Sequence, residues 1–298
     1  MSSGAASVLV VGGSGLVGTQ LLERFADDAM GTRNATAAPG LIALDITDAR
    51  ACRELLAELR PTTVIHCAAL THVDLCEREP ERSHAVNVVG TRNVAEAAAR
   101  VGARYLFFST DYVFGGDAGP HRLDEPFNPL NAYGAHKLEA EQLVAGICED
   151  HVIVRACNLY GYQPGGKNFV MAVWNCGHNG VPMRVPRDQW GCPTLAADLS
   201  ESTRLLAGSS IRGAVHLAGP DYLDRESLAR RAADAFRIDA SFIVGVDTVE
   251  LGQEAARPRH GGLDASATEA SLGFRFRDLT AGLRDMSAAF ARETRRNG

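Results

Sequence analysis

The chain has 298 residues, of which 46% are hydrophobic and 22% are charged, an ordinary composition for a folded globular protein. Its formal net charge of −6 argues against a nucleic-acid partner, because phosphate backbones are bound by basic faces. The first residues lack the basic and apolar regions of a signal peptide, and no stretch approaches the roughly 20 apolar residues of a membrane span. The seven cysteines include no Cys-x-x-Cys pair, so reduced thiols are expected. We therefore expect a cytoplasmic protein with neither a nucleic-acid nor a membrane partner.

Strand-like apolar runs alternate with helical patterns from the start of the chain to about residue 160. The predicted strands cover residues 7–12, 29–33, 41–44, 63–67, 105–109 and 151–156, and the predicted helices cover 16–25, 48–59, 81–101 and 132–148. This alternation is typical of an α/β fold built on a doubly wound parallel Rossmann sheet with right-handed crossovers.

The pattern changes after residue 160. Residues 161–190 are rich in Gly, Pro, Asn and aromatic residues, and only one further strand, at 214–217, and a helix over 225–236 are predicted with a clear order. We expect a nucleotide-binding Rossmann domain over residues 1–160 and a smaller, loop-rich substrate-binding region over residues 161–298. The strand at 214–217 is expected to return to the sheet of the first domain.

A glycine-rich turn joins the first predicted strand to the first predicted helix. Its sequence, Gly12-Gly13-Ser14-Gly15-Leu16-Val17-Gly18, fits both a Gly-x-Gly-x-x-Gly and a Gly-x-x-Gly-x-x-Gly spacing. Glycines allow a tight turn and a close approach of the backbone to a pyrophosphate at the helix N-terminus. The alternative is an ordinary glycine turn, but the strand–turn–helix context favours a dinucleotide site formed by Gly12, Gly15, Leu16, Val17 and Gly18.

The end of the second predicted strand bears on which dinucleotide binds. NAD-specific sites usually place an acid there for the ribose 2′-hydroxyl, whereas an arginine suits a 2′-phosphate. Here the segment is Met30-Gly31-Thr32-Arg33-Asn34, with Arg33 and no acid, so NADP(H) is favoured over NAD(H). Asp45 follows the third strand and, with Ile46, is expected beside the adenine ring. The alternative for Asp45 is a turn or capping role just before Thr47 and Asp48.

Tyr133 and Lys137 stand one helical turn apart, on the same face of a predicted helix. The chain has 28 arginines and only two lysines, Lys137 and Lys167, so a retained lysine suggests a use for a compact ammonium. A nearby cation lowers the pKa of a phenol and helps it to give a proton to a carbonyl oxygen. Ser109 and Thr110 end the fifth predicted strand, at the sheet edge where such folds bind ligands. The alternatives are a solvated helix face and strand-end hydroxyls that satisfy backbone groups.

These motifs occur in the order found in extended short-chain dehydrogenases, and the chain more narrowly resembles the dTDP-4-dehydrorhamnose reductases. The segments that carry the resemblance are the glycine turn, His66-Cys67-Ala68-Ala69, Asn87-Val88-Val89-Gly90-Thr91, Ser109-Thr110-Asp111-Tyr112-Val113-Phe114, Tyr133 with Lys137, Leu44-Asp45-Ile46-Thr47-Asp48, Gly166-Lys167-Asn168-Phe169 and Asp188-Gln189-Trp190-Gly191-Cys192-Pro193-Thr194. The likeness continues to Arg257-Pro258 and therefore covers nearly the whole chain.

The resemblance implies roles for individual residues. It implies a catalytic trio of Thr110, Tyr133 and Lys137. It implies that the cofactor also contacts Cys67, Ala68, Ala69, Asn87, Ser109, Tyr133 and Lys137, and that the substrate contacts Thr71, Val73, Thr110, Asn158, Lys167 and Asn168. The expected reaction is NADPH-dependent reduction of the 4-keto group of a nucleotide-linked 6-deoxyhexose. For Lys167 a solvated loop position is the alternative to a phosphate contact.

One segment departs from the pattern of these reductases. They commonly carry tryptophan in an Arg-Thr-Ser-Trp stretch, whereas this chain has Arg155-Ala156-Cys157-Asn158. Asn158 resembles the residue that faces the diphosphate in sugar-nucleotide epimerases, so an NAD-dependent epimerase stays open. Dehydratases usually follow the threonine with Asp-Glu, and Tyr112 stands at that second position here, which disfavours dehydration.

A non-catalytic subunit is the remaining alternative, because the regulatory subunit of methionine adenosyltransferase resembles the same reductases. The nine histidines show no His-x-x-x-His spacing, so no metal site is predicted. Families of this kind commonly form dimers, which makes a homodimer an expectation.

Overall fold

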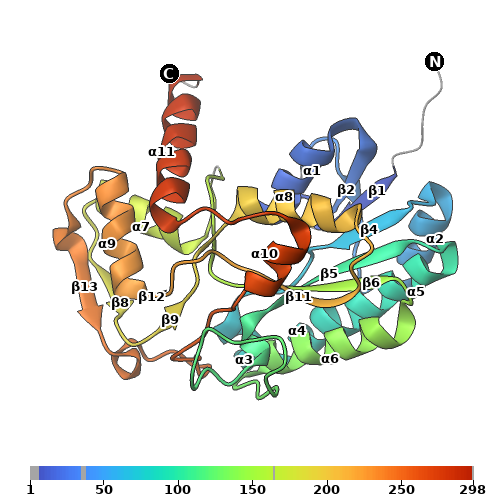
Figure 1. Cartoon of the computed structure of the whole chain (residues 1–298), viewed down its shortest axis with the longest axis horizontal. Helices are drawn as coiled ribbons and strands as arrows, with labels where there is room; N and C mark the ends of the chain where they lie inside the picture. The colour runs from blue at the N-terminus through green and yellow to red at the C-terminus, as the bar shows by residue number, and fades with distance from the viewer. Residues whose placement is uncertain (1–6, 35–37, 164, 297–298) are drawn as a thin grey trace.

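The computed structural model describes residues 7–34, 38–163 and 165–296, and its centre is a seven-stranded parallel sheet (Figure 1). The strand order is β11-β6-β5-β4-β1-β2-β3. The strands are β1 (Val8–Val11), β2 (Ala29–Arg33), β3 (Ile42–Ala43), β4 (Thr63–His66), β5 (Arg104–Thr110), β6 (His151–Ala156) and β11 (Gly213–Leu217). The order reverses between β1 and β4, which is the topological switch point where doubly wound folds bind ligands. The predicted fold class is confirmed, and β11 joins the sheet beside β6 as expected.

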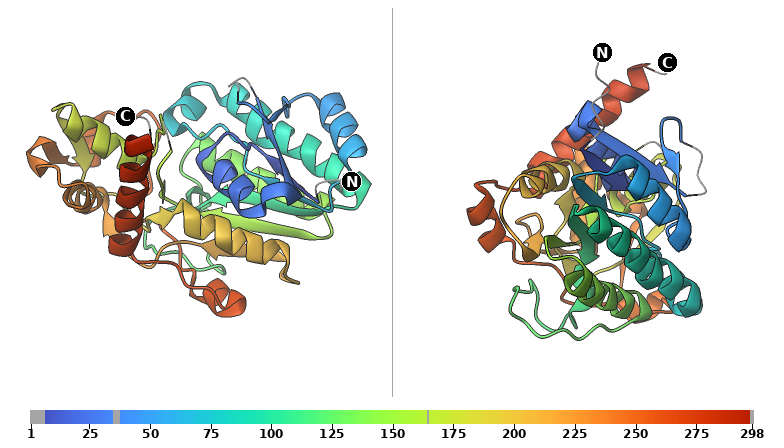
Figure 2. Two further views of the ribbon diagram at one scale, coloured as in Figure 1. Left: turned by 90° about the horizontal axis from the view of Figure 1, so that it is seen from above. Right: turned by 90° about the vertical axis from the view of Figure 1, so that its right-hand side faces the viewer.

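Helices cover both faces of this sheet (Figure 2). One face carries α2 (Ala49–Leu59), α5 (Thr91–Val101) and α6 (Ala132–Ile147), and the other carries α1 (Leu16–Phe25), α8 (Ala196–Ala207) and α10 (Ser266–Leu272). Successive strand residues point to opposite faces, so Leu9 and Val11 join the core under α2 and α5, while Val8 and Val10 join the core under α1 and α8. Burial on both faces explains the nearly continuous apolar character of β1.

The predicted helix over residues 81–101 is interrupted. Its parts are α4 (Pro80–His84), the π-helical segment η2 (Ala85–Gly90) and α5, and a short unpredicted helix, α3 (Val73–Arg78), precedes them. The side chain of Asn87 lies in the π-helical segment and bonds both backbone groups of Leu70, at 2.8 and 3.0 Å. π-helical turns are frequent at functional sites, and this one holds the loop that follows β4.

The second region is more helical than the sequence indicated. The prediction of a loop-rich stretch over residues 161–190 is wrong in part, because it contains α7 (Phe169–His178) and β8 (Met183–Pro186). With α9 (Arg225–Ala235), α11 (Leu279–Arg296) and β13 (Ile243–Val246), these elements enclose a separate core beside the sheet (Figure 1). The remaining short elements are β7 (Leu159–Tyr160), β9 (Trp190–Gly191), β10 (Thr194–Leu195), β12 (Leu223–Asp224), η1 (Ala26–Asp28), η3 (Asp111–Val113), η4 (Ala240–Phe242) and η5 (Thr248–Leu251).

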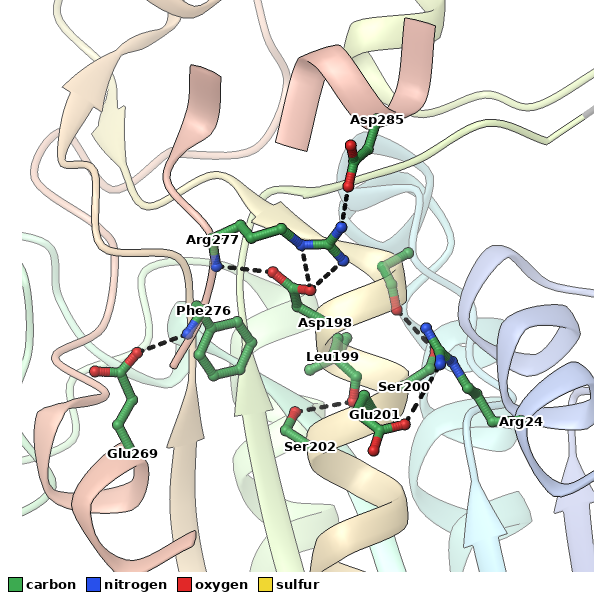
Figure 3. Close-up of polar contacts among 11 residues, drawn as sticks. Arg24, Asp198, Leu199, Ser200, Glu201, Ser202, Glu269, Phe276, Arg277 and Asp285 are labelled. Carbon is green, nitrogen blue, oxygen red and sulfur yellow. Dashed lines mark hydrogen bonds and ion pairs between the residues drawn. The ribbon is translucent and has the colours of Figure 1, made fainter. Parts of the chain in front are cut away.

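Charged side chains fasten the C-terminal segment to the Rossmann domain (Figure 3). Arg277 donates from its backbone and its Nε to the two oxygens of Asp198 on α8, both at 2.8 Å, and also contacts Asp285 on α11. The Asp198 side chain is only 6% exposed, so these bonds compensate a carboxylate that is buried at the start of α8.

Candidate active site

The glycine-rich turn brings backbone N–H groups to the switch point of the sheet. Gly12 has φ of +93°, and a Cβ atom there would lie 2.7 Å from the backbone nitrogen of Ala68; one at Gly18 would lie 2.2 Å from the oxygen of Gly12. Glycine is therefore required at both positions. Helix α1 begins here with neither a side-chain cap nor an acidic residue in its first turn, so its N-terminal N–H groups and positive dipole end are open to an anion.

A cleft of about 620 Å³ opens from this turn across the carboxyl ends of β1, β4, β5 and β6. It brings together most of the residues predicted from the sequence. Those lining it are Gly12, Gly15, Leu16, Val17, Gly18, Cys67, Ala69, Thr71, Ser109, Thr110, Tyr133, Lys137, Asn158, Lys167 and Asn168. Residues that lie more than 150 positions apart thus face one space, a concave site that is large enough for a small-molecule ligand.

The end of β5 supplies two hydroxyl groups to the cleft. The Thr110 hydroxyl accepts from the Tyr112 backbone at 3.2 Å and donates to Asp111 Oδ1 at 3.2 Å. The Ser109 Oγ is buried and finds no hydrogen-bond partner among the residues that the structure describes. Because a buried unpaired hydroxyl is costly, Ser109 fits a position where a bound molecule completes the bonding.

Helix α6 places Tyr133 beside Thr110. Asn131 caps the helix by accepting from the Gly134 backbone at 2.9 Å, and a Cβ at Gly134 would lie 2.2 Å from the oxygen of Tyr112. Burial raises the pKa of the Tyr133 phenol above its usual value, and its hydrogen bond to Thr110 opposes this rise. The prediction that a neighbouring cation lowers this pKa is wrong, because burial dominates and the opposing contribution comes from the Thr110 hydroxyl rather than from Lys137.

Lys137 lies on the floor of the cleft with 2% exposure. Its Nζ donates to the Phe108 carbonyl oxygen at 2.6 Å and lies 3.9 Å from the centre of the Phe107 ring. Burial lowers the pKa of this ammonium to about 7, and Glu141, one turn further along α6, opposes the shift. The protonation state of Lys137 is therefore sensitive to small changes in pH near neutrality.

Several predicted contact residues do not line the cleft. Ala68 packs against Gly12, and the side-chain amide of Asn87 is hydrogen-bonded to the backbone of Leu70. Asp45 accepts from the Thr47 backbone and hydroxyl at 2.9 and 2.8 Å, which is the turn role that the sequence left open.

Three further predicted residues, Val73, Ile46 and Arg33, also lie outside the lining of this cleft. Val73 begins α3, and Ile46 is 5% exposed in the core. The Nη1 of Arg33 donates to the Asn34 carbonyl at 3.1 Å, whereas its buried Nε has no partner within the described part of the chain.

Sequence reasoning missed a cationic extension of the cleft. Arg225, the first residue of α9, lines the cleft, donates to Asn158 Oδ1 at 2.6 Å and lies 5.0 Å from the centre of the Phe169 ring. It also lines an adjoining pocket of about 400 Å³ to which Arg184 and Arg257 contribute. No local pattern around these three arginines pointed to a site, because the fold alone brings them together.

A family model described as RmlD substrate binding domain matches residues 6–292 of the chain. The chain belongs to this family. The resemblance to dTDP-4-dehydrorhamnose reductases that the motifs carried is thereby confirmed at the level of the family.

Individual relatives agree with the family match. A dTDP-4-dehydrorhamnose reductase of Streptomyces griseus is 37% identical over 270 residues, which are 88% of this chain and 87% of that protein. The methionine adenosyltransferase 2 subunit beta of Xenopus tropicalis is 31% identical over 88% of this chain and 81% of its own length. The structure of a dTDP-4-dehydrorhamnose reductase from Bacillus anthracis in complex with NADP has a TM-score of 0.86 and 31% identity, covering 94% of this chain and 97% of that one.

The described residues contain no group of three or more His, Cys, Asp or Glu side chains that is placed to hold a metal ion. Within the same residues, no helix combines the length and the apolar character that crossing a membrane requires.

Proposed function

We propose that this protein uses NADPH to reduce the 4-keto group of a dTDP-linked 6-deoxyhexose. The observation that carries the proposal is the single cleft in which the glycine turn at α1 faces Thr110, Tyr133 and Lys137. Family membership and the reductase from Streptomyces griseus support the same reaction.

The residues present fit a nicotinamide dinucleotide. Gly12 and Gly18 allow the tight packing of the turn, and the uncapped N-terminus of α1 in this turn faces the cleft, as a pyrophosphate needs. The unpaired Ser109 hydroxyl faces the same cleft. For the adenosine end, the partly unpaired guanidinium of Arg33 at the end of β2 supports a 2′-phosphate and thus NADP(H). The relative from Bacillus anthracis was solved with NADP. When bound, this cofactor supplies the hydride.

In this proposal Tyr133 is the proton donor. Its raised pKa keeps the phenol protonated in the resting site. The alkoxide that develops on the substrate oxygen is a stronger base than the phenolate, so it takes the proton. Thr110, at the end of β5, donates to the same oxygen once its hydroxyl turns away from Asp111, and the Lys137 ammonium at the cleft contributes positive charge. The three groups together stabilise the developing oxyanion.

The nucleotide diphosphate is assigned to the cationic extension. Arg225 bonds the amide oxygen of Asn158 rather than a carboxylate, so its charge stays available to an anion. The exposed Lys167 also lines the cleft, and the adjoining pocket with Arg184 and Arg257 has room for the nucleoside. This placement points the sugar toward Tyr133.

The test follows NADPH oxidation with dTDP-4-keto-6-deoxyglucose and its 3,5-epimer supplied separately, and with NADH in parallel. Turnover of either sugar with a higher kcat/KM for NADPH supports the proposal. Tightly bound NAD in the purified protein with epimerisation of the sugar would replace it by the epimerase reading. Inertness toward both sugars, together with co-purification of a methionine adenosyltransferase catalytic subunit, would replace it by a binding-subunit role.

A further inference from the structure

Two cysteine thiols meet at the wall of the cleft. Cys157 lines the cleft beside Asn158, and its Sγ donates to the carbonyl oxygen of Cys192 at 3.3 Å. The neighbouring Cys157 thiol lowers the pKa of Cys192, while Cys192 and burial raise the pKa of Cys157. Both cysteines are free thiols in this structure.

The backbone positions of the two cysteines suit a disulfide. Each lies two residues before a strand, and these strands, β7 and β10, pair in parallel with Leu159 opposite Thr194. The Thr194 backbone nitrogen also donates to the Asn158 carbonyl oxygen at 3.2 Å, which continues the pairing toward the cysteines. Neighbouring strands lie about 4.8 Å apart, within the range of roughly 4.4–6.8 Å that separates the Cα atoms of a disulfide.

We propose that Cys157 and Cys192 form a reversible disulfide that shuts down the cleft when a peroxide is present. The thiolate of one cysteine attacks a peroxide oxygen and breaks the O–O bond, which leaves a sulfenic acid and one water molecule. The second thiol then attacks that sulfur, the S–S bond forms, and the hydroxyl departs with a proton as a second water molecule. The two thiols thus give up two electrons and two protons, and the peroxide is reduced to water.

The consequence for the cleft follows from what the two cysteines contact. Asn158 follows Cys157, has φ of +48° and holds Arg225 at 2.6 Å, so a shift at position 157 moves the assigned diphosphate contact. On the other side, a Cβ at Gly262 would lie 2.9 Å from the Cys192 Sγ, and the Gly262 nitrogen donates to Asp111 beside Thr110. Drawing the two sulfurs to bonding distance therefore disturbs both ends of the substrate site. A displacement on the order of 1 Å can lower turnover roughly 100-fold.

The other cysteines provide internal comparisons. Cys67 also lines the cleft, and burial raises the pKa of its thiol, just as Cys192 and burial raise the pKa of Cys157. The pair differs from Cys67 because it includes Cys192, whose lowered pKa favours the reactive thiolate. Cys176 lies on α7, outside the lining of the cleft, and is half-buried. A Cys176→Ser variant is therefore the matched control for variants of the pair.

The experiment treats the full chain with one to a few equivalents of hydrogen peroxide and follows bond formation and turnover separately. Trypsin places the two cysteines in different peptides, residues 156–167 and 188–204, each with one cysteine. A linked pair of these peptides, two hydrogen atoms lighter than their sum, reports the bond whether or not the protein is a reductase. Turnover of the ketosugar rests on the proposed function and is measured on the same samples before and after dithiothreitol.

The expected result is a linked 156–167/188–204 pair and a 10- to 100-fold loss of kcat/KM that dithiothreitol restores. Cys192→Ser should abolish both effects, Cys157→Ser should do the same, and Cys176→Ser should keep both. Absence of the linked pair, linkage through Cys67, a linked pair without loss of turnover, or a loss that persists in Cys192→Ser overturns the proposal. If the reduced protein turns over neither sugar, the proposed function fails, and the linked peptides together with the affinity for dTDP before and after treatment still decide the inference.

Discussion

A buried ion pair fastens α6, the helix that carries Tyr133 and Lys137, to strand β6. Arg155 donates from Nε to Glu141 Oε1 at 3.0 Å and from Nη2 to Oε2 at 2.7 Å. The two side chains are only 3% and 4% exposed, and the guanidinium carbon lies 4.7 Å from the centre of the Phe127 ring. The pair is therefore bidentate, desolvated and shielded from salt.

Removal of one partner should be far more harmful than removal of both. In Glu141→Ala the guanidinium of Arg155 stays buried without a compensating charge, and the free energy of unfolding should fall by about 3–5 kcal/mol. A double change to Glu141→Leu and Arg155→Met removes both charges and keeps most of the volume, so its loss should be smaller than that of Glu141→Ala alone.

Urea unfolding at neutral pH measures these changes, with the midpoint and the slope reported separately. The control is Glu54→Ala, which breaks the exposed Arg50–Glu54 pair on α2, with side chains 79% and 63% exposed, and should leave the midpoint unchanged within error. If Glu141→Ala is as harmless as Glu54→Ala, or if the double variant is less stable than Glu141→Ala, the reasoning about the buried pair is refuted.

Three further predictions concern the cleft and the core. Tyr133→Phe should lower kcat roughly 100- to 10,000-fold, the usual contribution of general acid catalysis, while NADPH affinity measured by fluorescence stays within about threefold; near-normal turnover would contradict the assigned role. Gly18→Ala places a Cβ 2.2 Å from the backbone oxygen of Gly12 and should abolish NADPH binding. In Gly15→Ala the Cβ meets the same oxygen at 3.5 Å, so this variant should fold with unchanged stability in thermal unfolding. Equal NADPH affinity and equal thermal stability of the two variants would be inconsistent with the steric argument. Burial lowers the pKa of His66 to about 3 and, with the nearby Arg155, the pKa of His216 to about 4. The unfolded chain takes up these protons below pH 6.5 and the folded chain does not, so the free energy of unfolding should fall as the pH decreases from 6.5 toward 4, by on the order of 1 kcal/mol per pH unit for each histidine. Urea titrations at several pH values give the free energy of unfolding as a function of pH. This free energy should depend less steeply on pH in His216→Asn than in the unchanged chain, and an equally steep dependence would remove His216 from the explanation.

Local sequence determined much of the sheet and the cofactor half of the cleft. The predicted bounds of α1, β2 and β6 are those observed, because hydrophobic periodicity and flanking glycines act over a few residues. The glycine turn and the Tyr133–Lys137 spacing also needed no tertiary information, since each motif lies within one strand–turn–helix unit or one helix turn. The helices α8 and α11 were missed because their stability comes from packing against distant segments, including the contacts of Arg277 with Asp198 and Asp285 (Figure 3).

Only the tertiary structure decided which side chains converge and how deeply they are buried. Arg225 meets Asn158 across 67 positions of sequence, and no local pattern encodes that contact. The spacing of Tyr133 and Lys137 suggested a phenol with a lowered pKa, but the fold buries both groups, so the pKa of the phenol rises and that of the ammonium falls to about 7. Desolvation depends on everything that packs around a group. The sequence therefore named the reacting groups, and the packing of the whole chain set their charge states and their partners.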